Sequence, residues 1–178
     1  ADAFGVATFA EARRVRELTT KPVLAWLWDP HEELPDGVDV AAPSMTHLHS
    51  LIDAPTAPTV YLKVDTGMHR SGIDEVRWQE AFEVALDAQR EGKLEVAGLM
   101  THFSCADDPS DPYTDQQAAG FRRAIAQARQ VGLEVPRNHA ANSPATWTRP
   151  DLHFDMVRPG LSLYGLEPVD GLDHGLKP

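Results

Sequence analysis

The chain has 178 residues, of which 42% are hydrophobic and 24% charged, a composition typical of one soluble globular domain. Its formal net charge of -11 argues against a surface that binds nucleic acid or anionic membranes, and no apolar run reaches membrane-spanning length. The single cysteine, Cys105, excludes a disulfide framework within the chain and favours a reducing, cytoplasmic location.

The first elements are a strand, a helix and a second strand. Residues 1–7 already read as a strand with no signal peptide before it, so we expect a piece of a longer protein. Thr8 and Glu11 form a capping box, which predicts a helix with Leu18 on its apolar face. The continuous apolar run at residues 22–28 is typical of a strand covered on both faces.

The same alternation continues to the end of the chain. Ser44 caps a short predicted helix, and Asp74 caps a longer one. Thr114 and Gln117 form a second capping box, which opens a helix that Gly132 ends. The predicted strands are residues 1–7, 22–28, 38–42, 59–64, 94–103, 135–141 and 153–157.

Strands that alternate with helices indicate parallel βα units. The seven predicted strands are one short of an eight-stranded barrel, so a barrel fragment and an open doubly wound sheet both fit the pattern. A dinucleotide-binding fold would carry a glycine-rich turn after its first strand, whereas residues 5–8 contain a single glycine. This weakens the doubly wound alternative.

A lysine interrupts the apolar strand at residues 59–64. A buried lysine is costly unless it is paired or modified, so Lys63 either points to solvent from a half-exposed strand or has such a partner or modification. Arg70 follows it in a loop with two glycines, Gly67 and Gly72.

Other chemically reactive or charged residues also follow predicted strands, where a βα barrel keeps its active site. Alone, His102 could be a core histidine bonded to a neighbouring carbonyl, and Arg158 could be a surface ion-pair partner. The presence of polar residues at several predicted strand ends favours a functional site. The residues at these ends are Lys63, Arg70, His102, His139, Asn142, Ser143, Arg158 and Gly160.

A phosphate site is one interpretation of the last two strand ends. Ser143 followed by Pro144 has the layout of an N-cap and the first helical residue, and free N–H groups at a helix start attract anions. Gly160 would let a backbone N–H approach a ligand closely. An ordinary capped helix followed by a turn glycine is the alternative.

Four segments resemble the barrel domain of bacterial alanine racemase. In chain order they are YLKVDTGMHRSG, GLMTHFSCADD, HAANSPA and DMVRPGLSLYGLEP, and together they span nearly the whole chain. The resemblance implies a TIM-type (β/α)8 barrel of which this chain carries strands 2–8, without the first strand and the C-terminal β-domain. It also implies a pyridoxal 5'-phosphate (PLP) cofactor and a homodimer. The barrel domain would be residues 1–167, and residues 168–178 would be a linker.

The resemblance assigns roles to single residues. Lys63 matches a lysine that is often carbamylated, which would turn a buried cation into an anion able to pair with Arg70, the residue that orients the substrate carboxylate. His102 matches the histidine beside the pyridine ring, Arg158 the arginine that faces the ring nitrogen, and His139 the residue that supports that arginine. The remaining cofactor contacts are Asn142, Ser143, Gly160 and Leu161. No metal is expected.

The resemblance places both catalytic bases outside this chain. The Schiff-base lysine would precede Ala1, and the catalytic tyrosine would come from the partner subunit's β-domain, beyond Pro178. None of Lys21, Lys93 and Lys177 matches the Schiff-base motif, so we expect the segment alone to bind cofactor poorly and to be inactive.

The full-length protein would interconvert L- and D-alanine for peptidoglycan precursors, with a small amino acid as substrate and no nucleic-acid or membrane partner. The alternatives are a racemase for serine or for many amino acids, a PLP-binding barrel protein with a role in cofactor homeostasis, and a plain non-enzymatic barrel or sheet protein.

Overall fold

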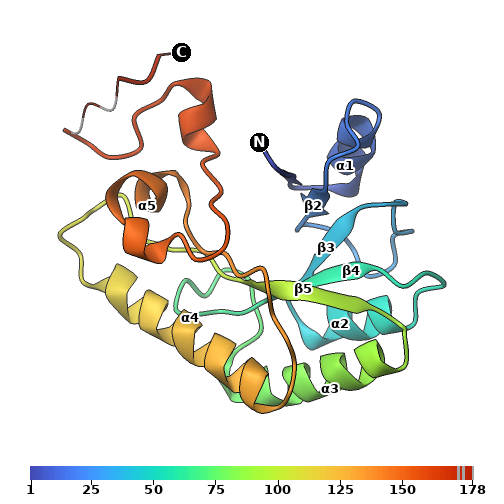
Figure 1. Cartoon of the computed structure of the whole chain (residues 1–178). Helices are drawn as coiled ribbons and strands as arrows, with labels where there is room; N and C mark the ends of the chain where they lie inside the picture. Colours follow the sequence, from blue (N-terminus) through green and yellow to red (C-terminus); the bar gives the residue numbers. More distant parts are fainter. Residues whose placement is uncertain (172, 174, 178) are drawn as a thin grey trace.

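A parallel β-sheet forms the centre of the computed structural model, which describes residues 1–171, 173 and 175–177. Its strands lie side by side in chain order and every neighbouring pair is parallel. Helices cover one side of the sheet (Figure 1). The architecture is that of a partial TIM-type barrel, as the family resemblance implied, and its parallel strands agree with the βα units that the alternation predicted. The strands are β1 Phe4–Val6, β2 Val23–Ala25, β3 Asp39–Ala42, β4 Thr59–Lys63 and β5 Glu95–Met100.

The sixth and seventh predicted strands, residues 135–141 and 153–157, are shorter than expected. Each joins the sheet through one isolated parallel bridge, Met100 to His139 and His139 to Met156. A side chain interrupts the ladder here, because Leu99 N–H donates to Asn138 Oδ1 at 3.0 Å. These two segments extend the sheet in the expected order without regular pairing.

Several other predictions differ from the structure at their boundaries. The apolar run at residues 22–28 pairs only over β2, because the N–H groups of Trp26 and Leu27 both turn to the carbonyl of Ala7, at 3.3 and 2.7 Å. Leu18 lies beyond the first helix and is 85% exposed, so its predicted place on the apolar face is wrong.

Thr8 and Glu11 form the predicted capping box, and Ser44 caps its helix by accepting from His47 N–H. Asp74 makes no capping hydrogen bond and precedes a 3-10 turn. The α-helices are α1 Phe9–Arg16, α2 Met45–Ile52, α3 Trp78–Arg90, α4 Tyr113–Gln130 and α5 Ser143–Thr148, and the 3-10 helices are η1 Glu75–Arg77, η2 Pro150–Leu152 and η3 Leu161–Tyr164.

The second capping box was predicted wrongly. Helix α4 begins at Tyr113, one residue before Thr114, and has no side-chain cap. The Gln117 side chain makes long-range hydrogen bonds instead.

The two faces of the sheet differ in what they bury. Alternate side chains of a strand point to opposite faces. On the helix-covered face Leu62 belongs to the main core, together with Phe82 of α3 and Phe121 of α4. On the other face a smaller cluster contains Tyr61, and Lys63 shares that face by alternation.

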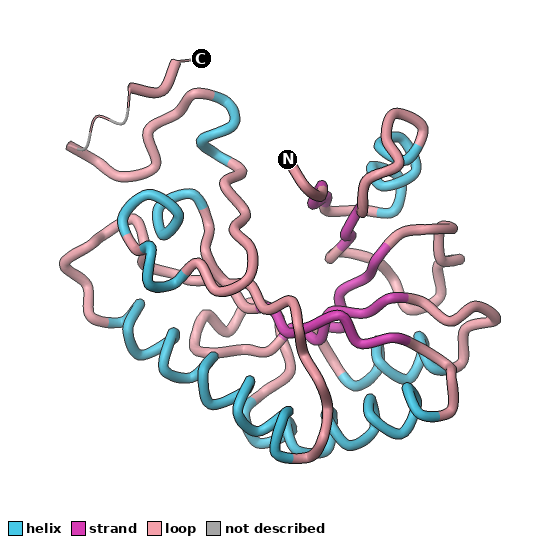
Figure 2. Tube along the Cα trace, viewed as in Figure 1, coloured by secondary structure: helices cyan, strands magenta, loops and turns pink. Residues whose placement is uncertain are grey.

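The chain beyond α5 consists mostly of loop, with η2 and η3 as short helical turns (Figure 2). The described residues beyond Glu167 form no helix or strand. Three residues of the predicted linker, Leu172, His174 and Pro178, lie outside the described part, and the domain boundary at residue 167 stays a prediction. None of the described helices is both long and apolar enough to cross a membrane.

Candidate active site

The predicted site residues gather at the carboxyl ends of the strands. Lys63 is the last residue of β4, and His102 comes two residues after β5. The charges of Arg158, Arg70 and Lys63 all lower the pKa of the His102 side chain, so all three lie within electrostatic reach of His102. The tertiary structure therefore brings together residues from three predicted strand ends.

Arg158 is held by three acceptors. Its Nη1 lies 2.5 Å from His139 Nδ1, and its Nη2 donates to the carbonyls of Thr101 at 2.7 Å and Ala140 at 3.2 Å. Burial lowers the pKa of the guanidinium to about 10, so it stays charged at neutral pH. The predicted alternative of a surface ion-pair partner is therefore wrong for Arg158.

His139 is fully buried and neutral. Burial, followed by the charge of Arg158, lowers the pKa of its imidazole well below the usual value. Arginine can only donate, so Nδ1 must accept and Nε2 carries the proton of the neutral ring. Nε2 has no hydrogen-bond partner among the described residues. The ring packs edge-on against Tyr61, with 4.9 Å between the ring centroids.

Lys63 is buried, with 6% of its surface exposed, so the alternative in which it points to solvent is wrong. Burial, followed by the charges of Arg70 and Arg158, lowers the pKa of its amine to about 8, while Asp65 acts in the opposite direction. Within the described part of the chain it has no ion-pair partner. A substantial neutral fraction near pH 8 is what carbamylation requires, and the modification itself stays a prediction.

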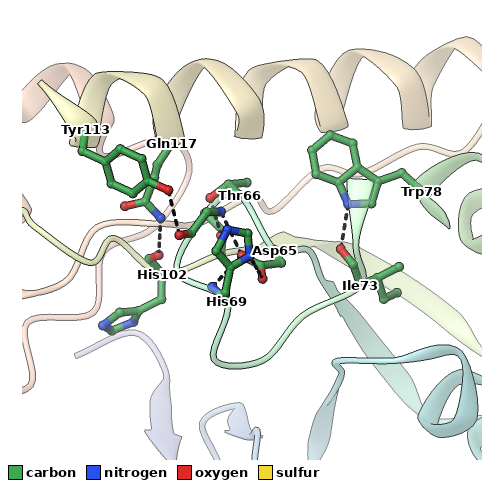
Figure 3. Close-up of polar contacts among 10 residues, drawn as sticks. Asp65, Thr66, His69, Ile73, Trp78, His102, Tyr113 and Gln117 are labelled. Carbon is green, nitrogen blue, oxygen red and sulfur yellow. Dashed lines mark hydrogen bonds and ion pairs between the residues drawn. The ribbon is translucent and has the colours of Figure 1, made fainter. Parts of the chain in front are cut away.

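His102 is half-buried and neutral. Its pKa falls to about 4, first through burial and then through the charges of Arg158, Arg70 and Lys63. Figure 3 shows its ring pointing away from α4, while its backbone carbonyl accepts from Gln117 Nε2 at 3.1 Å. A neutral aromatic ring in this position fits a packing role beside a planar ligand.

Arg70 sits exposed on a tight loop after β4. The loop closes where Asp65 N–H donates to the Ile73 carbonyl at 2.9 Å and Ile73 N–H donates to the Lys63 carbonyl at 2.8 Å. Asp65 Oδ1 accepts from Gly67 N–H at 2.8 Å. Gly72 has a φ of +141°, and a Cβ there would lie 2.6 Å from Asp65 N, so only glycine fits.

Asn142, and not Ser143, caps α5. The Asn142 side chain accepts from Ala145 N–H at 3.2 Å and donates to the Phe103 carbonyl at 3.4 Å. Ser143 is the first helical residue, because the Asn142 side chain occupies the capping position. The predicted N-cap is therefore displaced by one residue.

Ser143 instead connects α5 to the segment after Arg158. Its buried hydroxyl accepts from Ser162 N–H at 3.2 Å. Gly160 has an ordinary φ of -61°, and a Cβ built on it would meet nothing within 4 Å. Neither the backbone nor the packing of the chain requires glycine there, which is compatible with a ligand that needs the space. Leu161 begins η3 and is partly exposed.

Thr101 is a residue that the sequence analysis missed. It is 2% exposed, and its hydroxyl pairs with that of Thr66 at 2.9 Å while its carbonyl accepts from Arg158. Its place at the end of β5, next to His102, was the available signal. Tyr113 and Gln117 were missed as well, because their partners are distant in sequence.

The family described as "Alanine racemase, N-terminal domain" matches residues 1–168. The alanine racemase of Corynebacterium efficiens is 55% identical over 186 residues, which cover 100% of this chain and 50% of that protein. The crystal structure of alanine racemase from Corynebacterium glutamicum superposes with a TM-score of 0.94 at 49% identity, covering 100% of this chain and 52% of that one. An alanine racemase from Bartonella henselae, described with covalently bound pyridoxal phosphate, shares the fold with a TM-score of 0.80 at 24% identity, over 99% of this chain and 52% of that one. The chain thus spans about half the length of the relatives it matches.

Proposed function

The chain belongs to the alanine racemase N-terminal domain family, and from that premise we propose that the full-length protein is a PLP-dependent racemase that interconverts L- and D-alanine. The observation that carries the proposal is the hydrogen-bonded pair of half-buried Arg158 and fully buried His139 at the carboxyl ends of the strands, beside the neutral ring of His102. The proposal includes a cytoplasmic homodimer that supplies D-alanine for peptidoglycan.

The chemistry of the site residues fits PLP. For the phosphate, Ser143 would offer its hydroxyl and Leu161 a backbone N–H. Gly160 offers open space because it has no side chain, while its own N–H donates to the Arg158 carbonyl at 2.9 Å. His102 would pack beside the pyridine ring and Arg158 would face the ring nitrogen. When bound, PLP withdraws electrons from the substrate's α-carbon and makes its proton acidic.

Arg158 would act as a permanent hydrogen-bond donor. A guanidinium does not give up its proton in the working pH range, so Arg158 can donate a hydrogen bond to a ring nitrogen without protonating it. His139 keeps this donor in place because its unprotonated Nδ1 accepts from Nη1. By leaving the ring nitrogen unprotonated, Arg158 would limit how strongly electron density is drawn from the α-carbon and so restrict side reactions there.

Arg70 would hold the substrate carboxylate. The guanidinium is exposed at the tip of a loop that the Asp65 carboxylate and two glycines constrain, so a small anion can reach it. The two groups that move the α-proton, a lysine and a tyrosine in this family, would come from parts of the protein outside these 178 residues.

The full-length protein with PLP should form D-alanine from L-alanine, measured by chiral chromatography, and L-serine should be assayed in parallel. Formation of D-serine from L-serine at an equal or higher rate would indicate a racemase of broader substrate specificity, and not one specific for alanine. Bound PLP, seen by its absorbance, without racemisation of either amino acid would favour a role in cofactor homeostasis. Failure to bind PLP would refute both the alanine racemase and the racemase of broader specificity.

A further inference from the structure

Two side chains at the start of α4 reach two different loops of the candidate site. Tyr113 and Gln117 are four residues apart, so they lie one helical turn apart on the same side of α4. Tyr113 contacts the loop that carries Arg70, and Gln117 contacts the segment that carries His102 (Figure 3). Neither residue contributes a charge to the site.

Both ends of the Gln117 amide make hydrogen bonds, and these determine its orientation. Its Oε1 accepts from Ser104 N–H at 2.9 Å and from the Ser104 hydroxyl at 3.0 Å, and its Nε2 donates to the His102 carbonyl at 3.1 Å. A backbone N–H can only donate and a carbonyl can only accept, so a carboxylate cannot replace this amide. Gln117 is 0% exposed, which leaves these contacts without competition from water.

The Tyr113 hydroxyl donates to the Gly67 carbonyl at 2.9 Å. The contact depends on the glycine, because its φ is +129° and a Cβ there would lie 2.5 Å from the Tyr113 oxygen. Gly67 is three residues before Arg70, and its own N–H is held by Asp65. Tyr113 thus ties α4 to the base of the Arg70 loop.

A third contact closes these links into a ring. The hydroxyls of Thr66 and Thr101 pair at 2.9 Å, which joins the Arg70 loop directly to the His102 segment. Helix α4 is a rigid reference for both, because its apolar side packs into the main core through Ala118, Phe121 and Ala124. The distance between the two loops is therefore set by this direct contact together with one helix from outside the site.

We propose that Tyr113 and Gln117 are positioning residues that set where Arg70 lies relative to His102. The inference deepens the proposed function, because it assumes that Arg70 binds the substrate carboxylate and that His102 packs against the cofactor. Tyr113 acts on substrate binding through the Arg70 loop. Gln117 acts on cofactor binding through the backbone of His102. The two effects are separable because each side chain contacts a different loop.

The Tyr113→Phe change in the full-length enzyme keeps the ring and removes only the hydroxyl. KM for alanine should rise about three- to tenfold, which is what the loss of one neutral hydrogen bond supplies, while kcat and the Kd for PLP stay near their wild-type values. A residue that only stabilises the fold would change the melting temperature and would not separate KM from kcat.

The Gln117→Glu change keeps an acceptor for Ser104 but replaces the donor to the His102 carbonyl with negative charge. The Kd for PLP, measured by titrating the apoenzyme and following absorbance, should rise about tenfold or more, with KM for alanine less affected. Gln127→Glu is the matched control, because it makes the same chemical change on the exposed side of α4, where Gln127 pairs with Gln79 at 3.0 Å. That control should behave as wild type.

The proposal is overturned if Tyr113→Phe leaves KM for alanine unchanged, or if Gln117→Glu weakens PLP binding no more than Gln127→Glu does. It is also overturned if both variants change KM, kcat and the Kd for PLP in parallel. A wild-type enzyme that forms no D-alanine would refute the proposed function and with it the claim about Arg70. The PLP titration needs no turnover and would still decide the claim about Gln117.

Discussion

The helix-covered face of the sheet, here called the outer face, and the opposite, inner face bury side chains that have different roles. Leu62 and Lys63 are neighbours in β4 and are 0% and 6% exposed, yet Leu62 joins the apolar core under the helices and Lys63 shares its environment with Arg70 and Arg158. A βα barrel packs side chains on both faces of its sheet and carries its chemistry at the carboxyl ends of the strands, where Lys63 lies. The degree of burial alone therefore does not separate a structural residue from a functional one; the face and the position along the strand do.

The two faces also satisfy their polar groups differently. On the outer face the buried side chains are mostly apolar, and the few polar atoms there bond to backbone carbonyls, as Trp28 Nε1 does with Ala41 at 2.8 Å. On the inner face and its rim, side chains from distant parts of the chain hold the backbone, as Arg158 does with the Thr101 carbonyl. Mutations on the outer face should change stability, and mutations on the inner face should change chemistry or its pH dependence.

The largest effect should come from the outer face. Leu62→Ala removes a fully buried side chain from the main core, and we expect the free energy of unfolding to fall by about 2–5 kcal/mol because a cavity remains. Urea denaturation of the full-length protein measures it. KM for alanine in the fraction that stays folded should be unchanged. A loss below about 1 kcal/mol would contradict this assignment of the core.

A substitution at the contact between β5 and the sixth segment, residues 135–141, should lower the free energy of unfolding almost as much. A Cβ on Gly98 would collide with the carbonyl oxygen of Arg137, which is backbone and cannot move aside cheaply. We expect Gly98→Ala to lower the free energy of unfolding by about 1–3 kcal/mol.

Gly120→Ala is the matched control for Gly98→Ala. In α4 its Cβ would have only ordinary contacts, the nearest at 3.5 Å from Thr66 Cβ, so it should raise the free energy of unfolding by about 0.5–1 kcal/mol. Equal effects of the two changes in thermal unfolding would show that the sixth segment does not pack where the structure places it.

Lys63 on the inner face should have a smaller effect on the free energy of unfolding, and this effect should depend on pH. The pKa of Lys63 is lowered to about 8 from its ordinary value of 10.5, so between these two values the unfolded chain binds more protons than the folded one. The free energy of unfolding should therefore rise with pH across this window, by at most about 1.4 kcal/mol per pH unit.

Lys63→Met should abolish that rise. The raised pKa of Tyr61 has the opposite sign, since its folded state loses stability as pH rises past 10, and it contributes equally to both variants. The difference in free energy of unfolding between wild type and Lys63→Met, from urea titrations at pH 7.5 to 10 in carbonate-free buffer, isolates the lysine. A pH-independent difference would mean that the amine is not free to titrate.

The sequence by itself determined the order of the elements, the parallel βα class, the caps at Thr8 and Ser44, and the collection of polar residues at strand ends. These depend on periodicity and on partners within four residues, which a local pattern contains. The four motif resemblances led to the family, which the match over residues 1–168 confirms.

Only the tertiary structure decided which groups compete for each hydrogen bond. The Asn138 side chain takes the Leu99 N–H and reduces the sixth strand to a bridge, and Gln117 bonds to Ser104 and His102 where a capping box was predicted. The burial of Lys63 was likewise decided by the segments around it. The two hydrogen-bonding outcomes depend on partners 13 to 39 residues away, and a local pattern contains no information about where such a partner will lie.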